Sequence, residues 1–319
     1  MKRFDAVCLG ELLVDFTPFG RSPAGMRLFE QNAGGGPANV AAALAAFGLR
    51  SAFVGKVGGD THGAFLRSAI ESMGADASGL IADPSVNTTL AFVTLDEGGE
   101  RGFSFISGAH LMLKAEELDM SHITNARVFN FSSLTMTAEP ALGATVSAAK
   151  QAREAGCIIA FDPNYRAPLW PGETRAAERI RSALPLCDIV KISEEEAVLL
   201  TGAANLNDAG QAVLDAGPLC VLITRGAEGA SVYLPSGCAR TPAMPAQVVD
   251  TTGAGDAFMA GFLYGLLTRG LHPRGMTPGD AREISVFAHA AAALCVSRRG
   301  GMPAMPRLDE VTALINKLT

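Results

Sequence analysis

From about residue 110 onward, short apolar runs alternate with stretches rich in Ala, Glu and Arg. The apolar runs predict strands at 128–131, 157–161, 189–192 and 219–223. The stretches between them predict helices over 139–155 and 176–184, and a further helix that begins at Glu194. Continuous apolar strands that alternate with helices are typical of a parallel sheet covered on both faces. In such an α/β fold, ligands bind at the carboxyl ends of the strands.

Two regions depart from this pattern. Alternating positions at 89–95 and 102–106 predict a hairpin with its turn at 96–101, and residues 12–31 are also strand-rich. We expect one domain over 1–319, with a small β-sheet inserted at about 12–31 and 88–107. This sheet either covers a site as a lid or extends the edge of the main sheet without such a role.

Composition narrows the class of protein. With 319 residues and 48% hydrophobic positions, the chain is long and apolar enough for one large core, which excludes general disorder. A formal charge of −6 without a basic cluster argues against a nucleic-acid partner. The six cysteines are widely separated, and neither they nor the five histidines have metal-ligand spacing, so we expect reduced, mostly buried thiols and no zinc site.

No segment predicts export or membrane insertion. The apolar part of the N-terminus is too short for a signal peptide. The most apolar stretch, 286–296, falls short of the roughly 18 residues that a membrane span requires. We therefore expect a cytoplasmic protein without a membrane partner.

The most informative segment is the glycine-rich loop D-T-T-G-A-G-D at 250–256, which opens a helix. Gly253 and Gly255 let the backbone approach a ligand closely. The first N–H groups of the helix would then point at the ligand, with the positive end of the helix dipole behind them. This predicts an anion hole suited to a phosphoryl group in transfer. Asp256 is either the N-cap of the helix or a general base for an attacking alcohol.

Several segments together resemble the ribokinase-like (PfkB) sugar kinase family. D-T-T-G-A-G-D-A-F at 250–258 resembles its C-terminal signature, and G-G-G-P-A-N-V-A at 34–41 resembles its N-terminal signature. Further similar segments follow in the same order along almost the whole chain: 10–15, 55–60, 162–166, 191–196, 224–229 and 297–304. G-E-L-L-V-D-F, D-P-N-Y-R-A-P-L-W and K-I-S-E-E-E are most similar to fructokinases. The resemblance implies a three-layer α/β/α sandwich with a mostly parallel central sheet and a small β-sheet lid.

The same resemblance implies an ATP- and Mg²⁺-dependent kinase that phosphorylates a primary hydroxyl of a monosaccharide, with D-fructose to fructose 6-phosphate as the first reaction to test. Asp256 would take the hydroxyl proton, and the N–H groups of Gly253, Ala254 and Gly255 would bind the developing charge. The implied sugar contacts are Asp15, Gly35, Gly36, Asn39 and Arg166. The implied nucleotide contacts are Asn164, Ser193, Glu196, Thr224, Gly226 and Gly229, with Glu196 reaching Mg²⁺ through water.

Some of these residues also have a purely local explanation. Asp15 could be a turn residue at a strand end, and Asn39 could cap a helix over 40–47. Arg166 could be a surface residue in a proline-rich loop. The order of the motifs favours the sugar-binding roles. Glu194 and Glu195 are expected to be first-turn helix charges.

The resemblance further implies a homodimer through the lid and a K⁺ site. The K⁺ ligands would be mainly the backbone carbonyls of Asp250, Thr252, Cys295, Arg298 and Gly300. Ala304 stands where ribokinase has a further serine ligand. Fructokinases usually end the lid hairpin with F-Y-R-N-P-S-A-D, whereas this chain has F-I-S-G-A-H at 105–110. The missing Arg argues against an acidic sugar and weakens the fructose assignment, and His110 is either a sugar contact or a solvent-facing loop residue.

Alternative functions fall into three classes. Within the family, the chain could be a 2-keto-3-deoxygluconate kinase, a ribokinase or a nucleoside kinase, or a non-catalytic sensor of sugar or nucleotide. A dehydrogenase is disfavoured because Asn39 stands where the third glycine of G-x-G-x-x-G belongs. A P-loop ATPase is disfavoured because Gly55-Lys56 is followed by Val57.

Overall fold

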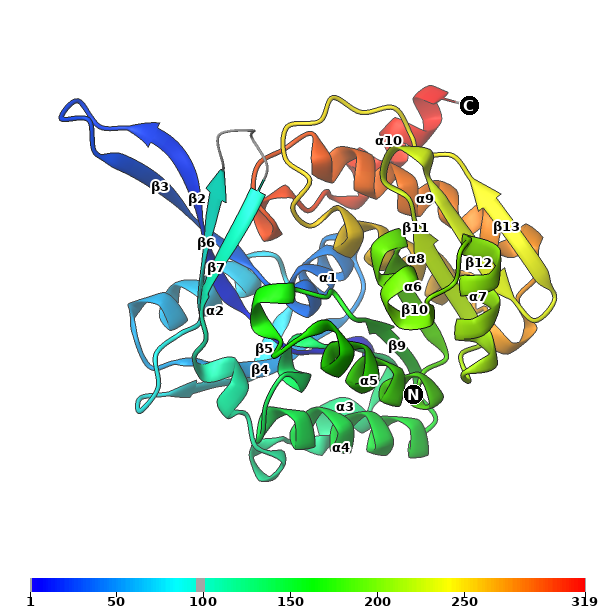
Figure 1. Cartoon of the computed structure of the whole chain (residues 1–319), viewed down its shortest axis with the longest axis horizontal. Coiled ribbons are helices and arrows are strands. Elements are labelled where there is room, and N and C mark those ends of the chain that lie inside the picture. The colour runs from blue at the N-terminus through cyan, green and yellow to red at the C-terminus, as the bar shows by residue number, and fades with distance from the viewer. Residues whose placement is uncertain (1, 96–100, 319) are drawn as a thin grey trace.

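The computed structural model describes residues 2–95 and 101–318. Within these residues, a nine-stranded central sheet lies beside a separate four-stranded sheet (Figure 1). Across the central sheet the strands are β13 (Gly237–Thr241), β12 (Ala230–Leu234), β11 (Cys220–Thr224), β10 (Ile189–Ser193), β9 (Ile158–Asp162), β8 (Ala126–Ser132), β1 (Phe4–Leu9), β4 (Ser51–Gly58) and β5 (Asp76–Asp83). Neighbours from β11 to β5 are parallel, whereas β12 and β13 are antiparallel to their neighbours.

Helices cover both faces of the central sheet. Successive side chains of a strand point to opposite faces, so Ala6 and Cys8 of β1 enter one core and Val7 and Leu9 enter the other. The first core is closed by α1 (Gly36–Ala46), α2 (Thr61–Ser72), α8 (Ala254–Thr268), α9 (Pro278–Val296) and α10 (Leu308–Leu318). The second is closed by α3 (Met120–Thr124), α4 (Ala141–Glu154), α5 (Glu173–Ala183), α6 (Glu194–Thr201) and α7 (Leu206–Asp215). The expected three-layer α/β/α arrangement is confirmed.

The strands and helices predicted between 128 and 223 are present with small shifts at their ends. The largest shift concerns α5, which begins at Glu173 rather than at Ala176. Gly172 precedes it with φ 149°, a conformation that favours glycine and places the helix start there. A carboxylate in the first turn, Glu173, also suits the helix dipole.

The second sheet has the order β3 (Arg27–Gly34), β2 (Leu13–Arg21), β6 (Leu90–Leu95) and β7 (Arg101–Ile106). β2 pairs with β3 and β6 with β7 in antiparallel fashion, whereas β2 and β6 are parallel. Its far end, formed by β2 and β3, projects from the body of the molecule (Figure 1). Because it is a separate sheet, the alternative of an edge extension of the main sheet is wrong. Most of the predicted turn at 96–101 lies outside the described residues.

All six cysteines are free thiols, and five of them are buried, as expected; Cys238 is exposed. In the part of the chain that the structure describes, no helix combines the length and apolarity needed to cross a bilayer.

Candidate active site

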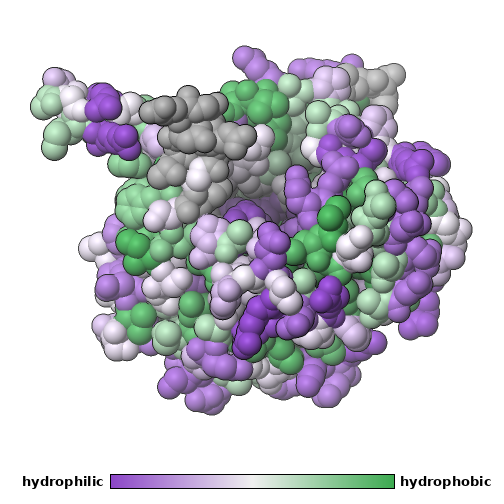
Figure 2. Space-filling model, viewed as in Figure 1, coloured by the Kyte–Doolittle hydropathy of each residue, from purple (hydrophilic) through white to green (hydrophobic). Residues whose placement is uncertain are grey.

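A cleft of about 540 Å³ opens where β1, β8, β9 and β10 end, beside the second sheet. The space-filling view shows a recess with hydrophilic side chains at this position (Figure 2). The cleft brings together most of the predicted site residues: Asp15, Gly35, Gly36, Asn39, Asn164, Arg166, Ser193, Glu196, Thr224, Thr252, Gly253, Gly255 and Asp256. Leu13 and Asp15 of β2 and Phe105 of β7 contribute the second sheet's part of the wall.

A second cavity of about 560 Å³ adjoins the first. Its wall includes Gly226 and Gly229, as predicted, but most of its side chains are apolar. They come from the segment 243–248, from α8 and from α9: Ala243, Met244, Pro245, Ala246, Val248, Phe258, Ala292, Ala293 and Val296, together with His289. Thr224, Thr251 and Gly255 line both cavities. The two cavities therefore meet at the first turn of α8.

The start of α8 depends on glycine. Gly253 is the N-cap with φ 80°, and a Cβ there would lie 2.8 Å from Met305 Cε. The first N–H groups of a helix lack carbonyl partners within the helix and can receive an anion. Of the three predicted donors, Ala254 already donates its N–H to the Thr251 carbonyl at 3.3 Å. Gly253 and Gly255 are therefore the better candidates for binding an anion.

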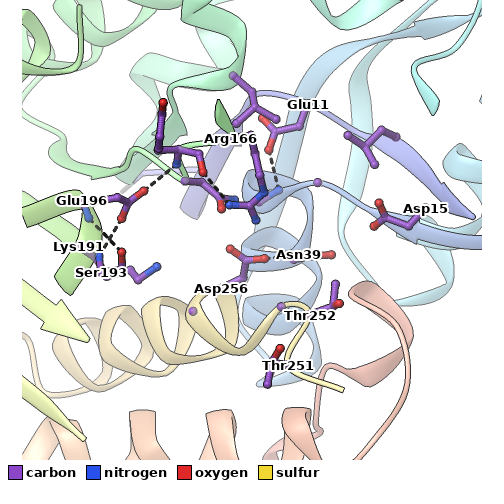
Figure 3. A pocket seen from close by; sticks show the side chains of 18 of the residues that line it. Glu11, Asp15, Asn39, Arg166, Lys191, Ser193, Glu196, Thr251, Thr252 and Asp256 are labelled. Atoms are coloured by element: carbon purple, nitrogen blue, oxygen red, sulfur yellow. Dashed lines mark hydrogen bonds between the residues drawn. The ribbon is translucent and has the colours of Figure 1, made fainter. Parts of the chain in front are cut away.

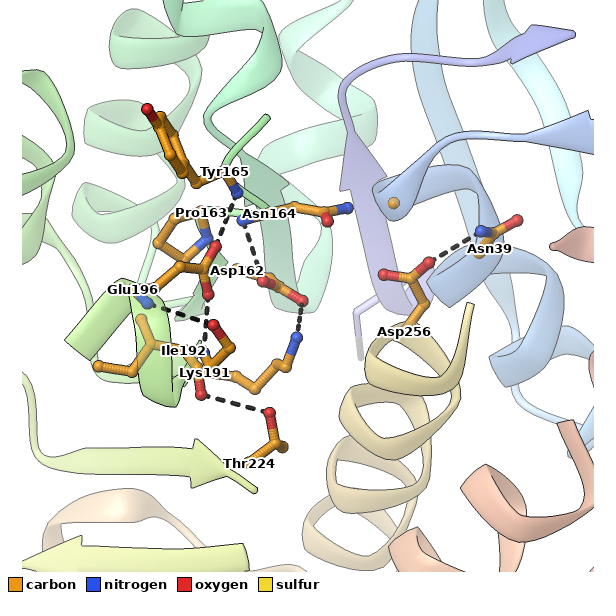
Figure 4. A network of polar contacts seen from close by, with 12 residues as sticks. Asn39, Asp162, Pro163, Asn164, Tyr165, Lys191, Ile192, Glu196, Thr224 and Asp256 are labelled. Atoms are coloured by element: carbon orange, nitrogen blue, oxygen red, sulfur yellow. Dashed lines mark hydrogen bonds and ion pairs between the residues drawn. The ribbon is translucent and has the colours of Figure 1, made fainter. Parts of the chain in front are cut away.

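Asp256 is the third residue of α8 and is 7% exposed. Its Oδ2 accepts a hydrogen bond of 2.8 Å from Asn39 Nδ2 (Figures 3 and 4). The N-cap alternative is wrong, because Gly253 occupies the cap position and no side chain caps this helix. Burial raises the pKa of Asp256 above its ordinary value, and the nearby Asp162 charge adds to this, against the opposing effect of Lys191.

Asn39 and Asp15 do not have the local roles considered as alternatives. Asn39 lies inside α1, which begins at Gly36, and therefore does not cap it. Within the described residues its buried Oδ1 has no hydrogen-bond partner. Asp15 lies inside β2, paired with Asn32, and not in a turn. Its burial raises its pKa to about 7, while the charge of Arg166 lowers it.

The ends of β9 and β10 carry a network of polar contacts (Figure 4). Lys191 Nζ donates to Asp162 Oδ2 at 2.8 Å, and both groups are buried. Burial alone would lower the pKa of Lys191, but the charges of Asp162, Glu196 and Asp256 outweigh it and raise the pKa. A Cβ at Gly255 would lie 2.6 Å from Lys191 Nζ, so this ammonium lies against the first turn of α8.

Ser193 and Glu196 form a capping box at the start of α6. Glu196 Oε2 accepts from the Ser193 N–H and Oε1 accepts from the Tyr165 N–H, each at 2.7 Å. These bonds hold the Glu196 carboxylate at the wall of the cleft. Burial raises its pKa. Glu194 and Glu195 also lie in the first turn of α6, as expected, and Glu195 additionally lines the cleft.

Neither Arg166 nor His110 lies at the solvent-facing loop position that the sequence left open for it. Arg166 is half-buried, lines the cleft and donates to the Tyr165 carbonyl at 3.1 Å, so the surface-loop alternative is wrong. His110 is 1% exposed, lies 2.5 Å from Thr89 Oγ1 through Nδ1 and does not line the cleft. It is therefore neither solvent-facing nor in a position to contact a ligand there. Its burial lowers its pKa to about 4.

The residues expected around K⁺ lie together beside the start of α8. The Asp250 carboxylate accepts the Thr252 N–H at 2.8 Å and the Gly300 N–H at 3.1 Å. Cys295 Sγ lies 3.5 Å from the Thr252 carbonyl oxygen, and the Cys295 carbonyl accepts the Arg298 N–H at 3.1 Å. Asp250 thus ties the loop before α8 to the loop after α9.

Sequence reasoning missed several residues that line the two cavities or lie beside them. Glu11, Asp162 and Lys191 are buried polar groups near the strand ends, and each belongs to a segment that the motifs had already marked. These three residues could have been found in the sequence as polar residues that lie in, or directly after, an apolar run. The apolar wall of the second cavity has no such signal, because Ala, Val and Met occur equally in any core.

Comparison with known proteins places the chain among carbohydrate kinases. The profile of the pfkB family carbohydrate kinases matches residues 3–308. The probable fructokinase-6 of Arabidopsis thaliana, a chloroplastic protein, is 41% identical over 313 residues, covering 96% of this chain and 80% of that protein.

Solved structures give the same result. Fructokinase from Xylella fastidiosa with bound ATP superposes with a TM-score of 0.91 at 34% identity, covering 98% of this chain and 99% of that one. Fructokinase from Vibrio cholerae, solved with fructose, ADP and calcium, has a TM-score of 0.88 at 31% identity and covers 97% and 98%. A double mutant of that enzyme was solved with fructose, ADP and potassium, with a TM-score of 0.85 at 30% identity and 99% of each chain covered.

Proposed function

The chain belongs to the pfkB family of carbohydrate kinases, and we propose that it transfers the γ-phosphate of ATP to a primary hydroxyl of D-fructose, giving fructose 6-phosphate. One observation carries this proposal. A polar cleft and a largely apolar cavity meet at the first turn of α8, where Gly255 lines both. A sugar in the first and a nucleotide in the second would place the γ-phosphate next to the Asp256 carboxylate and the N–H groups of Gly253 and Gly255.

Asp256 would act as the general base. Its carboxylate would take the proton of the sugar hydroxyl as the oxygen attacks the γ-phosphorus in line. The N–H groups of Gly253 and Gly255, with the positive end of the α8 dipole behind them, would stabilise the negative charge on the transferring phosphoryl group. The ammonium of Lys191, held by Asp162, adds positive charge against this turn.

The residues at the start of α6 suit an indirect contact with Mg²⁺. Mg²⁺ prefers carboxylate oxygens and keeps several of its waters. Backbone N–H groups hold both oxygens of Glu196 in place, and each oxygen keeps a lone pair that can accept a hydrogen bond from such a water. Asn164 and Ser193 lie on the same wall of the cleft. When bound, Mg²⁺ neutralises phosphate charge.

A K⁺ ion would be held by the carbonyls of Asp250, Thr252, Cys295, Arg298 and Gly300, which belong to the two loops that Asp250 ties together. Carbonyl oxygens are suitable ligands for K⁺. Support comes from the contacts that bring these loops together and from the potassium in the Vibrio cholerae structure. The ion would act by fixing the loop before α8, and hence the anion hole.

The sugar half of the cleft favours a neutral sugar. The half-buried Asp15 carboxylate lines it and can accept hydrogen bonds from hydroxyl groups, and the buried Glu11 carboxylate lies on the same wall with both oxygens already bonded within the protein. A carboxylate on the substrate would be repelled by the charges of Asp15 and Glu11, which argues against 2-keto-3-deoxygluconate. The fructokinases among the relatives favour fructose over ribose or a nucleoside.

ADP release tests this proposal. We would follow it with ATP and Mg²⁺ against fructose, tagatose, ribose, 2-keto-3-deoxygluconate and nucleosides, each with and without K⁺. The expected result is release that depends on fructose, requires Mg²⁺ and is stimulated by K⁺. Greater release with another substrate would overturn the fructose assignment, and sugar binding without ADP release would favour a sensor.

Replacing Arg166 with Ala is expected to lower kcat/KM for the sugar by roughly 10–100-fold, which corresponds to the 1.5–3 kcal/mol of a charged hydrogen bond. Its positive charge also lowers the pKa of both Asp15 and Asp256, so its loss would leave more of these groups protonated. Because the side chain is only half-buried, the melting temperature should change little. Kinetics and thermal melting check this, and a collapse in melting temperature would show a structural role.

The kcat/KM for the sugar is expected to fall as the pH drops below neutrality. The active forms of Asp256 and Asp15 are the carboxylates, and burial raises both pKa values, that of Asp15 to about 7. Protonation, and with it the loss of activity, therefore begins near pH 7 instead of near pH 4. A kinetic pH profile between 5 and 9 at saturating ATP checks this, and a flat profile down to pH 5 would contradict it.

We also propose that two chains associate through the second sheet. Large apolar side chains are exposed at its far end, in β2, in β3 and in the turn between them: Phe19 at 59%, Met26 at 69%, Leu28 at 42% and Phe29 at 40%. Such a cluster is unusual for a surface that faces only water, and it fits a second copy of the same surface. Light scattering should give twice the chain mass, and Phe29→Glu should give the mass of one chain; an unchanged mass in this variant would place the interface elsewhere.

We place the reaction in the cytoplasm. The support is chemical, because six free thiols are suited to a reducing compartment. Fractionation of cells that produce the full chain tests this, and recovery in another compartment would contradict it.

A further inference from the structure

The carboxylate of Glu11 has no role in the mechanism above, although it is fully buried at the wall of the cleft. Glu11 follows β1, close to the start of α1. Its Oε1 accepts the Gly36 N–H at 2.7 Å (Figure 3). Its Oε2 accepts the Ser132 hydroxyl at 2.6 Å. One side chain thus joins three elements: the end of β1, the end of β8 and the start of α1.

The contact with Gly36 replaces a missing cap. The N-cap of α1 is Gly35, which has no side chain to accept a hydrogen bond from the first turn. Gly35 has φ 117°, and a Cβ there would lie 2.3 Å from the Glu11 carbonyl oxygen. The backbone of Glu11 therefore packs against this turn, and the Glu11 carboxylate satisfies one of the free N–H groups.

The first turn of α1 carries the residue that holds Asp256. Asn39 lies one helical turn after Gly35, and its N–H donates to the Gly35 carbonyl at 2.8 Å. Its Nδ2 donates to Asp256 Oδ2 at 2.8 Å. On its other side the Asn39 amide lies close to the backbone at Gly301, where an added Cβ would be only 3.0 Å from Asn39 Nδ2. A shift of the first turn of α1 would move this amide and, with it, the carboxylate of Asp256.

We propose that Glu11 is a positioning residue for phosphoryl transfer, which sets the first turn of α1 so that Asn39 orients the Asp256 carboxylate toward the sugar hydroxyl. This inference rests on the proposed role of Asp256 as the base. Rates of enzymes are sensitive to such placement, and a displacement of about 1 Å can cost roughly 100-fold.

The positioning role depends on hydrogen bonds and not on the charge of Glu11. Oε1 accepts the Gly36 N–H in either protonation state, and a protonated Oε2 can donate to Ser132 Oγ, as the amide of a Gln would. The charge still affects the pKa of Asp256, because the two carboxylates face the same cleft. The other charged groups that face Asp256 are Asp15 of β2, Arg166 after β9, Asp162 of β9 and Lys191 of β10.

Two substitutions separate geometry from charge. Glu11→Ala removes the support of α1, and we expect kcat to fall by roughly 10–100-fold. Glu11→Gln keeps both hydrogen bonds, and we expect its kcat at neutral pH to lie within about threefold of wild type. Its acid limb in a kcat pH profile should move to lower pH, because a negative charge near Asp256 is gone.

Asp5→Ala is the matched control. Asp5 is a buried carboxylate near the opposite end of β1, held by Arg50. Its truncation should lower the melting temperature without the loss of kcat seen in Glu11→Ala. An equal loss of kcat in Asp5→Ala would overturn the inference, because general destabilisation would then explain both variants.

Two further results would overturn it. One is a wild-type kcat in Glu11→Ala. The other is a folded Glu11→Gln that loses as much kcat as Glu11→Ala, because Glu11 would then act through its charge. The second result is decisive even if Glu11→Ala does not fold. Absence of sugar-dependent ADP release in the wild-type protein would instead refute the proposed function itself.

Discussion

Asp256→Asn is expected to lower kcat by roughly 10²–10⁴-fold, the range for loss of a general base, while sugar and ATP still bind. The amide oxygen of Asn can still accept the hydrogen bond from Asn39 Nδ2, so the side chain keeps its place. It cannot take the hydroxyl proton. Replacing a buried carboxylate with an amide also removes a desolvated charge, so the fold should not be weakened. ADP-release kinetics measure the loss of kcat, and titration calorimetry measures whether sugar and ATP still bind.

Asp280 provides a matched control for this substitution. It occupies the third position of α9, as Asp256 does in α8, but it lies at the surface and completes a capping box with Thr277. Asp280→Asn should therefore leave kcat unaffected and reduce stability slightly. Turnover by Asp256→Asn within about twofold of wild type would remove Asp256 from the mechanism, because loss of a base costs far more.

Gly255→Ala is expected to lower kcat by about 10²–10³-fold, as when an oxyanion-hole donor is lost. The new Cβ would lie 2.6 Å from Lys191 Nζ and would force this ammonium away from Asp162 Oδ2. It would also occupy the place where the two cavities meet, and hence the space for the phosphoryl group. Single-turnover measurements with both substrates saturating isolate this step.

The control for this change is Gly275→Ala, where an added Cβ meets nothing within 4 Å. It should have wild-type kinetics and stability. If Gly255→Ala kept the wild-type single-turnover rate, the first turn of α8 would not bind the transferring group. A slower rate together with a lower melting temperature is the expected combination, because the change also disturbs the buried ion pair between Lys191 and Asp162.

The strand and helix pattern from 128 to 223 was predictable because buried parallel strands have continuous apolar runs. The strand ends then indicated the side of the sheet on which ligands bind, and most predicted residues lie in the cleft there. The starts of α1 and α8 were less predictable. Local sequence could not show that Gly35 and Gly253 adopt positive φ and begin these helices ahead of Asn39 and Asp256.

Contacts distant in sequence account for the remaining errors. His110 is buried because it packs beside Thr89 from the other side of the lid hairpin, which no local pattern reveals. Glu11 and Lys191 acquire their neighbours only when β1, α1, β9 and β10 come together. The apolar second cavity is indistinguishable from core in the sequence, since its lining residues have no polar signature.

The most direct test is the ³¹P NMR spectrum of the wild-type protein after incubation with ATP, Mg²⁺ and fructose. A phosphoryl group accepted by a primary hydroxyl would give a phosphomonoester signal that grows in step with ADP. This signal would be split by coupling to the two hydrogens on the carbon that carries the phosphate. Inorganic phosphate in place of that signal, or intact ATP despite proven binding of both ligands, would contradict transfer at the first turn of α8.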